Sequence, residues 1–205
     1  MEIGPMANFV YLLGDPATKT AAVVDPAWDV KRIIKAAEDD GYRITRILLT
    51  HGHPDHANGV DELASTTGAE VYAHPAESFW LKDLRTKIRP YEGGTISIGE
   101  ISVSVIHTPG HSAGSVCLIA GENFLTGDTL FVGACGRTDL PGGSAKELFE
   151  SFQKIRQLDD SLILCPGHHY GPECTSTLGM EKQGNSFLAT RGLNNFLKLA
   201  SPSVV

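Results

Sequence analysis

The stretch Thr50-His51-Gly52-His53-Pro54-Asp55-His56 restricts the chemistry of this chain more than any other segment. Three imidazoles and one carboxylate stand within six residues of it. Each of these side chains needs a polar or ionic partner once it leaves water, so such a concentration rarely serves packing. The apolar run Ile47–Leu49 comes just before and predicts a strand that delivers the cluster into a loop at its C-terminal end. We therefore interpret the stretch as part of a metal site.

The spacing within this stretch suits two ions. Residues two apart in an extended segment point to the same side, so His51 and His53 can chelate one ion. Pro54 supports this arrangement because a proline disfavours helical backbone at the preceding residue. Asp55 and His56 follow the bend and point elsewhere, where they can hold a second ion. Two divalent ions about 3.5–4 Å apart need a bridging ligand and further imidazoles.

Three later loops supply candidates for the missing ligands. His111, Asp128 and His168 each follow an apolar strand, in a loop rich in glycine or proline. The strands expected before them cover residues 101–106, 123–126 and 162–165. Ligands at the same end of several strands can converge, which predicts an α+β fold with a layered β-sandwich, flanking helices and a site at one rim. Imidazole and carboxylate ligands without thiolate suit zinc, iron or manganese.

Hydrophobic periodicity and terminal residues predict the helices around these strands. They are expected over residues 28–40, 58–67, 75–84, 144–158 and 185–199. Ser144 with Glu147 three residues later has the capping-box pattern of a helix N-terminus.

Composition favours a soluble protein that acts on a small molecule. With 205 residues and 41% hydrophobic residues, the chain is expected to form one domain over residues 1–205, with a short helical C-terminal tail. The net charge of −7 disfavours nucleic acids and membranes as partners and leaves a homo-oligomer open. Residues 1–5 show no signal peptide, so we expect a cytoplasmic location. Four widely spaced cysteines are expected to be free thiols: Cys117, Cys135, Cys165 and Cys174.

Four motifs together resemble the metallo-β-lactamase fold superfamily. They are His51-Gly52-His53-Pro54-Asp55-His56, Thr108-Pro109-Gly110-His111-Ser112, Gly127-Asp128-Thr129-Leu130-Phe131 and Pro166-Gly167-His168, in the family's order over nearly the whole chain. Within the superfamily, the chain resembles the glyoxalase II (hydroxyacylglutathione hydrolase) branch and its short bacterial relatives. Residues 136–143, with the sequence GRTDLPGG, are typical of those relatives and also resemble persulfide dioxygenases.

The resemblance implies a four-layer αββα sandwich and assigns the ligands. It places His51, His53 and His111 on a first metal ion. It places Asp55, His56 and His168 on a second ion, with Asp128 as the bridge between the two. An aspartate at the position of Asp25 often buttresses the ligand loop in this superfamily.

The resemblance also suggests substrate contacts. Arg137 stands where glyoxalase II enzymes often have a basic residue facing glutathione, and Asp139 and Tyr170 match positions that contact glutathione in persulfide dioxygenases. Another interpretation makes Arg137 a surface charge paired with Asp139 and gives Tyr170 a packing role at the rim.

Three functional hypotheses follow. The leading one is hydrolysis of a thioester, such as a hydroxyacylglutathione, by attack of a metal-bound hydroxide that Asp55 helps to orient. It uses two divalent ions, with zinc as the first choice and iron or manganese as alternatives. The second is a persulfide dioxygenase with one Fe(II) on His51, His111 and Asp128, acting on glutathione persulfide. The third is a non-catalytic metal-binding protein. The fold cannot choose among them, because it hosts many reactions.

Overall fold

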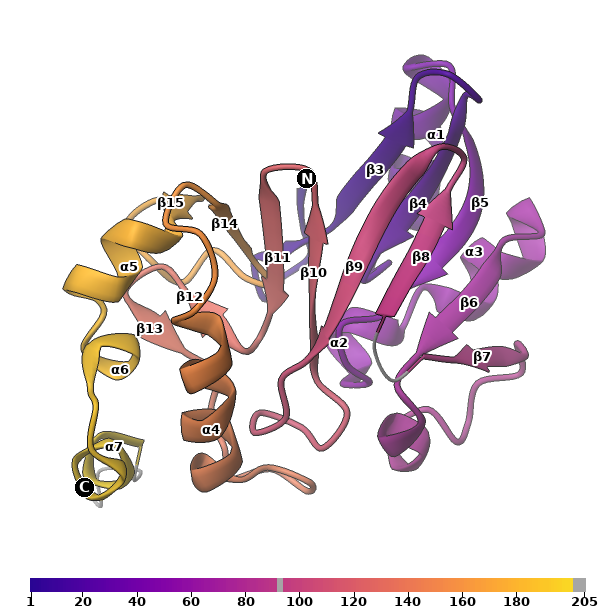
Figure 1. The fold of residues 1–205 in the computed structure, drawn as a ribbon. Coiled ribbons are helices and arrows are strands. Elements are labelled where there is room, and N and C mark those ends of the chain that lie inside the picture. The colour runs from indigo at the N-terminus through magenta and orange to yellow at the C-terminus, as the bar shows by residue number, and fades with distance from the viewer. Residues whose placement is uncertain (92–93, 201–205) are drawn as a thin grey trace.

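Two β-sheets packed face to face form the centre of the computed structural model, which describes residues 1–91 and 94–200 (Figure 1). The five-stranded sheet contains, in spatial order, β3 (Tyr11–Asp15), β4 (Thr20–Val24), β5 (Arg43–Leu48), β6 (Glu70–Ala73) and β7 (Ile88–Pro90). The six-stranded sheet contains β15 (Ser176–Thr177), β14 (Ile163–Pro166), β11 (Asn123–Gly127), β10 (Val116–Ala120), β9 (Ile101–His107) and β8 (Gly94–Ile98). Two short ribbons pair β1 (Glu2–Ile3) with β2 (Asn8–Phe9), and β12 (Leu130–Phe131) with β13 (Ala134–Cys135).

Helices cover the outer face of each sheet (Figure 1). The five-stranded sheet packs against α1 (Val30–Asp39) and α3 (Val60–Thr67). The six-stranded sheet packs against α4 (Ala145–Ile155), α5 (Leu178–Gly184), α6 (Ser186–Ala189) and α7 (Leu193–Ala200). Three apolar clusters result, one between the sheets and one under each helical layer. The predicted four-layer αββα sandwich of the α+β class is therefore confirmed.

The sequence of β4 shows how one strand serves two layers. Val23 belongs to the cluster under α1 and α3, whereas Ala22 and Val24 belong to the cluster between the sheets. All three side chains are fully buried. Because successive side chains of a strand point to opposite faces, a continuous apolar run suits a strand that is covered on both sides.

Strand ends meet at one rim of the sandwich. β4 runs parallel to β5, and β11 runs parallel to β14, so their C-terminal ends lie on the same side within each sheet. The Val116 amide donates to the Thr50 carbonyl at 2.8 Å, which joins the two sheets there. The Gly167 amide donates to the Gly127 carbonyl at 2.8 Å in the same region. This rim carries the loops that were predicted to hold the ligands.

Most of the predicted helices are present, with shorter bounds. Ser144 is the N-cap of α4 and accepts the Glu147 amide at 3.2 Å, as the capping pattern predicts. The α-helix expected over residues 75–84 is wrong, because the chain forms only a 3₁₀ helix, η1 (Pro75–Phe79). The 3₁₀ helix ends where Trp80 and Leu81 pack inward against the loop that contains Gly52. The contact is so close that a Cβ on Gly52 would lie 2.8 Å from the Trp80 Cβ.

The single helix expected over residues 185–199 is also wrong. The chain forms α6 and α7, with extended backbone at Thr190 between them. The buried Arg156 side chain donates to the carbonyls of Leu188 and Thr190. These carbonyls are therefore satisfied without continuing the helix. The domain expected over residues 1–205 stays a prediction, and residues 92, 93 and 201–205 of it lie outside the described residues. Within the described ranges, the helices all lack the length and apolarity needed to cross a membrane.

Candidate metal centre

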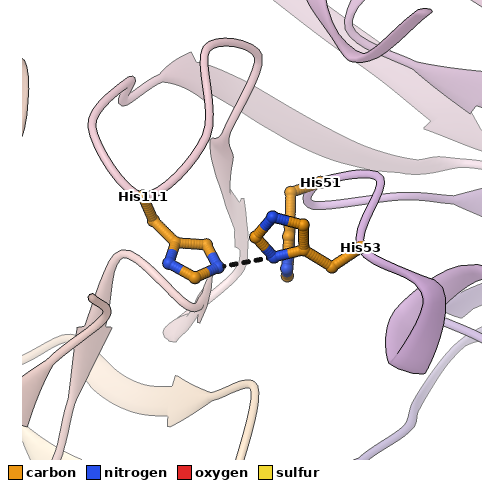
Figure 2. Close-up of side chains that lie close together, drawn as sticks. All are labelled: His51, His53 and His111. Carbon is orange, nitrogen blue, oxygen red and sulfur yellow. Dashed lines mark hydrogen bonds between the residues drawn. The ribbon is translucent and has the colours of Figure 1, made fainter. Parts of the chain in front are cut away.

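His51, His53 and His111 form a first group of side chains at the rim. Their candidate ligand atoms lie within 4.8 Å of one another, and all three residues are buried. Figure 2 shows His51 and His53 on one loop and His111 on another, with its Nε2 2.8 Å from the Nδ1 of His53. His53 has the extended backbone that Pro54 requires, at φ −62° and ψ 146°, and it is the N-cap of α2 (Pro54–Ala57). The expected chelating pair therefore lies on one side of the loop.

Asp55, His56 and His168 form a second group. Their candidate ligand atoms also lie within 4.8 Å of one another. The Nε2 atoms of His56 and His168 are 3.0 Å apart, and Asp55 Oδ2 is 3.4 Å from the former and 3.3 Å from the latter. Asp55 and His56 stand in the single turn of α2, and the centroid of the His56 ring lies 4.2 Å from that of His51.

Asp128 lies between the two groups. Its Oδ2 is 3.5 Å from His111 Nε2 and 3.3 Å from His168 Nε2, while its Oδ1 is 3.4 Å from His56 Nε2. A Cβ on Gly167 would come within 2.3 Å of Asp128 Oδ1, so a glycine there gives the carboxylate its space. This position between both groups is the one that a bridging ligand requires.

Hydrogen bonds on the outer side of the site fix the tautomers of four histidines. His51 Nδ1 lies 3.1 Å from Thr50 Oγ1, and His56 Nδ1 lies 3.1 Å from Asp25 Oδ2. His111 Nδ1 lies 2.8 Å from the Arg137 carbonyl, and His168 Nδ1 lies 2.8 Å from the Met6 carbonyl. Carbonyls and carboxylates only accept, so these Nδ1 atoms carry hydrogen and donate. Thr50 donates its own hydroxyl hydrogen to Asp25 at 2.5 Å and therefore accepts from His51. In the neutral rings the Nε2 lone pairs then face the site.

The donor set fits divalent metal ions. His51 Nε2, His53 Nε2 and Asp128 Oδ1 are buried and have no hydrogen-bond partner among the described residues. The Nε2 atoms of His56 and His168 face each other at 3.0 Å, so this pair must share a proton or bind a cation. Buried nitrogen and carboxylate ligands without thiolate suit zinc, iron or manganese.

The two groups differ in the pKa values of their histidines, because carboxylates lie against the histidines of the second group. Burial lowers the pKa of His51 well below its usual value and that of His53 to about 4. Burial also opposes the charged form of His56, but Asp128 and Asp25 outweigh it and raise the pKa of His56 well above the usual value. Burial is likewise outweighed at His168, where hydrogen bonds to Asp128 and Asp55 raise the pKa to about 9. Positive charge is thus favoured at the second group.

Asp25 holds the ligand loop, as predicted. Its Oδ1 accepts the Thr50 amide at 2.7 Å, and its Oδ2 accepts the Thr50 hydroxyl and faces His56 Nδ1. Asp25 has a φ of +51°, a left-handed conformation that aspartate tolerates better than most residues. Its oxygens approach the outer Nδ1 side of the ring of His56, so Asp25 supports the site from behind.

Other supporting residues were not found from the sequence. Asn8 Nδ2 donates to Asp55 Oδ2 at 3.0 Å, and Trp28 Nε1 donates to Asn8 Oδ1 at 2.8 Å. Glu77, fully buried, contacts the two loops that carry the first group. These residues come from segments distant in the chain and have no motif of their own, so no local pattern indicates their roles.

The expected substrate contacts lie at the edge of the site. Arg137 pairs with Asp139 through Nε–Oδ1 at 2.6 Å and Nη2–Oδ2 at 2.7 Å, and both side chains are exposed. The ion pair of the alternative interpretation is thus confirmed. Tyr170 is 55% exposed and stacks on the His168 ring at 4.4 Å, so it packs at the rim beside the second group. A substrate role for these three residues stays a prediction.

The remaining histidines and the cysteines lie outside both groups. His74 and His107 stack on each other at 4.1 Å, and His169 pairs with Glu2 at 2.9 Å. All four cysteines are free. Burial raises the pKa of Cys135 to about 12 and that of Cys165 to about 11, which argues against a thiolate nucleophile near the site.

Comparisons with known proteins find relatives of this chain. A model of the metallo-beta-lactamase superfamily matches residues 3–168, a range that contains every candidate ligand. A hydroxyacylglutathione hydrolase of Rhodospirillum rubrum is 36% identical over 190 residues, which cover 91% of this chain and 72% of that protein. The probable polyketide biosynthesis zinc-dependent hydrolase PksB of Bacillus subtilis is 35% identical over 166 residues, covering 80% of this chain and 74% of that protein. The crystal structure of ETHE1 from Myxococcus xanthus has a TM-score of 0.88 and 27% identity, covering 98% of this chain and 88% of that one.

Proposed function

The chain belongs to the metallo-beta-lactamase superfamily, and from this premise we propose that it is a metal-dependent hydrolase of thioesters such as hydroxyacylglutathiones. One observation carries the proposal: four histidines point their Nε2 atoms into a buried space that Asp128 divides. The similarity to the hydroxyacylglutathione hydrolase of Rhodospirillum rubrum supports the substrate class.

In this proposal two ions occupy the two groups. His51, His53 and His111 would hold the first ion and Asp55, His56 and His168 the second, with Asp128 placed to contribute to both. Divalent ions bound this way lower the pKa of bound water towards about 7 and polarise a carbonyl group. Zinc is the first choice, in line with the zinc-dependent hydrolase among the relatives, and iron or manganese suit the same ligands.

Asp55 has a second role in the proposal. Burial opposes its ionisation, but hydrogen bonding with His168 and the charge of His56 outweigh this and lower the pKa of Asp55 to about 2. It is therefore an ionised acceptor at neutral pH, and Asn8 fixes the direction of its Oδ2. Such a carboxylate can accept a hydrogen bond from the attacking water and orient it. A thiolate leaving group needs little help from a general acid, so the site can work without a further acid.

Arg137, Asp139 and Tyr170 are proposed to contact the glutathione part of the substrate. Tyr170 flanks the second group through its stacked ring, and Arg137 reaches the site through its backbone, whose carbonyl holds His111. A cationic side chain beside the centre suits the carboxylates of a glutathione thioester.

Elemental analysis of the purified protein and steady-state hydrolysis of S-lactoylglutathione test the proposal. We expect two zinc ions per chain and turnover of the thioester. Asp128→Ala should lose bound metal and turnover together, whereas the exposed control Asp83→Asn should keep both. A metal-loaded protein that hydrolyses neither S-lactoylglutathione nor a simpler thioester would refute the hydrolase assignment.

A persulfide dioxygenase is the second candidate. His51, His111 and Asp128 make a two-histidine, one-carboxylate set, with Asp128 Oδ2 3.5 Å from His111 Nε2. The resemblance of residues 136–139 to persulfide dioxygenases supports this candidate. One iron per chain and oxygen uptake with glutathione persulfide would favour it. Two zinc ions without oxygen uptake would exclude it, and turnover in either assay would exclude a non-catalytic metal-binding protein.

A further inference from the structure

Glu77 is a buried carboxylate with three hydrogen-bond donors around it. Its side chain is fully buried, in η1. Oε2 accepts the Gly52 amide at 2.7 Å. Oε1 accepts the Gly114 amide at 2.6 Å and the Ser112 hydroxyl at 2.6 Å.

The three donors belong to the two loops that carry the first group. Gly52 stands between His51 and His53, and Ser112 and Gly114 follow His111. These loops lie 58 residues apart in sequence, as measured between His53 and His111. One carboxylate therefore ties together the loops whose separation sets the distance between His53 Nδ1 and His111 Nε2.

Two glycines make this close contact possible. A Cβ on Gly52 would lie 2.8 Å from Glu77 Oε2. A Cβ on Gly114 would lie 2.8 Å from both Cγ and Oε1 of Glu77. Since real Cβ atoms do not approach other atoms this closely, both loops need glycine to receive the carboxylate.

The geometry suits an ionised carboxylate. Hydrogen bonds to a charged acceptor are about twice as strong as neutral ones, and a buried charge without partners is costly. With Oε1 accepting two hydrogen bonds and Oε2 one, the carboxylate is held at both oxygens. A neutral amide in its place would direct an N–H group at one of these donors.

We propose that Glu77 is a positioning residue that fixes the spacing of His53 and His111 and thereby sets the metal affinity of the first group. The inference rests on the proposed function in one respect, namely that this group binds a metal ion. Glu77 reaches the site through Gly52, Ser112 and Gly114, so its influence is on geometry and affinity.

The test measures zinc affinity of the purified full chain by chelator competition, together with the visible spectrum of the cobalt(II) form. Glu77→Gln should weaken zinc binding about 10- to 100-fold, the range typical of residues that orient ligands. Its cobalt spectrum should differ from that of the wild type, because the ligand geometry changes. Gly114→Ala should act in the same direction, since its Cβ displaces the carboxylate. The exposed control Glu62→Gln should stay within twofold of the wild type.

Only variants that fold can test whether Glu77 sets the metal affinity. Far-UV circular dichroism of the metal-free proteins identifies the folded variants. Zinc affinity within twofold of the wild type and an unchanged cobalt spectrum, in folded Glu77→Gln or in folded Gly114→Ala, would overturn the proposal. If Glu77→Gln does not fold, Gly114→Ala decides it alone. A wild-type chain that binds zinc without hydrolysing thioesters refutes the hydrolase assignment and leaves this comparison valid, whereas a wild-type chain that binds neither zinc, iron nor manganese refutes both.

Discussion

The Nε2 atoms of His56 and His168 lie 3.0 Å apart in a buried part of the site, while the Nδ1 atoms of both rings donate to Asp25 and to the Met6 carbonyl. Two neutral rings in this arrangement would present lone pairs to each other, so the pair must share a proton or bind a cation. A cation between them removes the repulsion, and Asp55 and Asp128 add negative charge at 3.3–3.4 Å from these nitrogens. We therefore expect a metal ion at this place to stabilise the fold as well as to supply chemistry.

Removal of metal should lower the melting temperature. A ligand at about 100 times its dissociation constant stabilises the folded state by about 2.7 kcal/mol, which corresponds to roughly 5–10 °C for a chain of this size. Scanning fluorimetry of the metal-loaded and chelator-treated protein measures the difference. His168→Gln should reduce it, and the neighbouring His169→Gln should leave it intact. A melting temperature that does not respond to the chelator would contradict the metal assignment.

Asp15 gives a prediction about stability and pH that does not involve the metal centre. The Thr18 hydroxyl at 2.6 Å and the Glu100 amide at 2.9 Å hold the pKa of Asp15 at about 2, below its ordinary value of 3.8. A lowered pKa means that its contribution is complete above about pH 4 and is lost as the pH falls towards 2. Asp15→Asn should therefore be less stable than the wild type at pH 7, and the difference should shrink below pH 4.

Urea midpoints at pH 7 and pH 3 measure this contribution of Asp15. The exposed control Asp83→Asn should follow the wild type at both values. A gap between Asp15→Asn and the wild type that is equal at pH 7 and pH 3 would show that the charge of Asp15 is not its source.

The positions of the candidate ligands could be predicted because their chemistry is concentrated locally. His51, His53, Asp55 and His56 stand in one short loop, and His111, Asp128 and His168 each follow an apolar strand. The alternation of buried residues along such strands also indicates the layered fold. Both signals depend on residues close together in sequence, where spacing translates directly into geometry.

Supporting residues could not be predicted, because their contacts depend on tertiary packing. Asn8 reaches Asp55 across 47 positions, and Glu77 reaches Gly114 across 37. The break between α6 and α7 has the same origin, since Arg156, at the end of α4, donates to the carbonyls of Leu188 and Thr190. The helical period of a sequence does not indicate that a side chain from a distant segment will bind the carbonyls of the expected helix.

Thr50 should influence the zinc affinity of the first group through the His51 ring. Its hydroxyl accepts from His51 Nδ1 at 3.1 Å and donates to Asp25 at 2.5 Å. Thr50→Val removes the hydroxyl and keeps the shape, so we expect about a tenfold loss of zinc affinity. Thr50→Ser keeps the hydroxyl and should bind zinc like the wild type. Chelator competition measures both variants, and a loss in Thr50→Ser with wild-type affinity in Thr50→Val would assign the role to packing of the methyl group instead.

Substitution of Arg137 should affect substrate binding without affecting metal binding. Its carbonyl holds His111, but its guanidinium is exposed and pairs only with Asp139 among the described residues. Removing the side chain in Arg137→Ala keeps the carbonyl, so metal content and kcat should stay unchanged. An exposed charge contact contributes up to about 1 kcal/mol, which predicts about a fivefold rise in KM for S-lactoylglutathione. The KM for a thioester without carboxylates should not change, and an equal rise for both substrates would mean that Arg137 shapes the site without recognising glutathione.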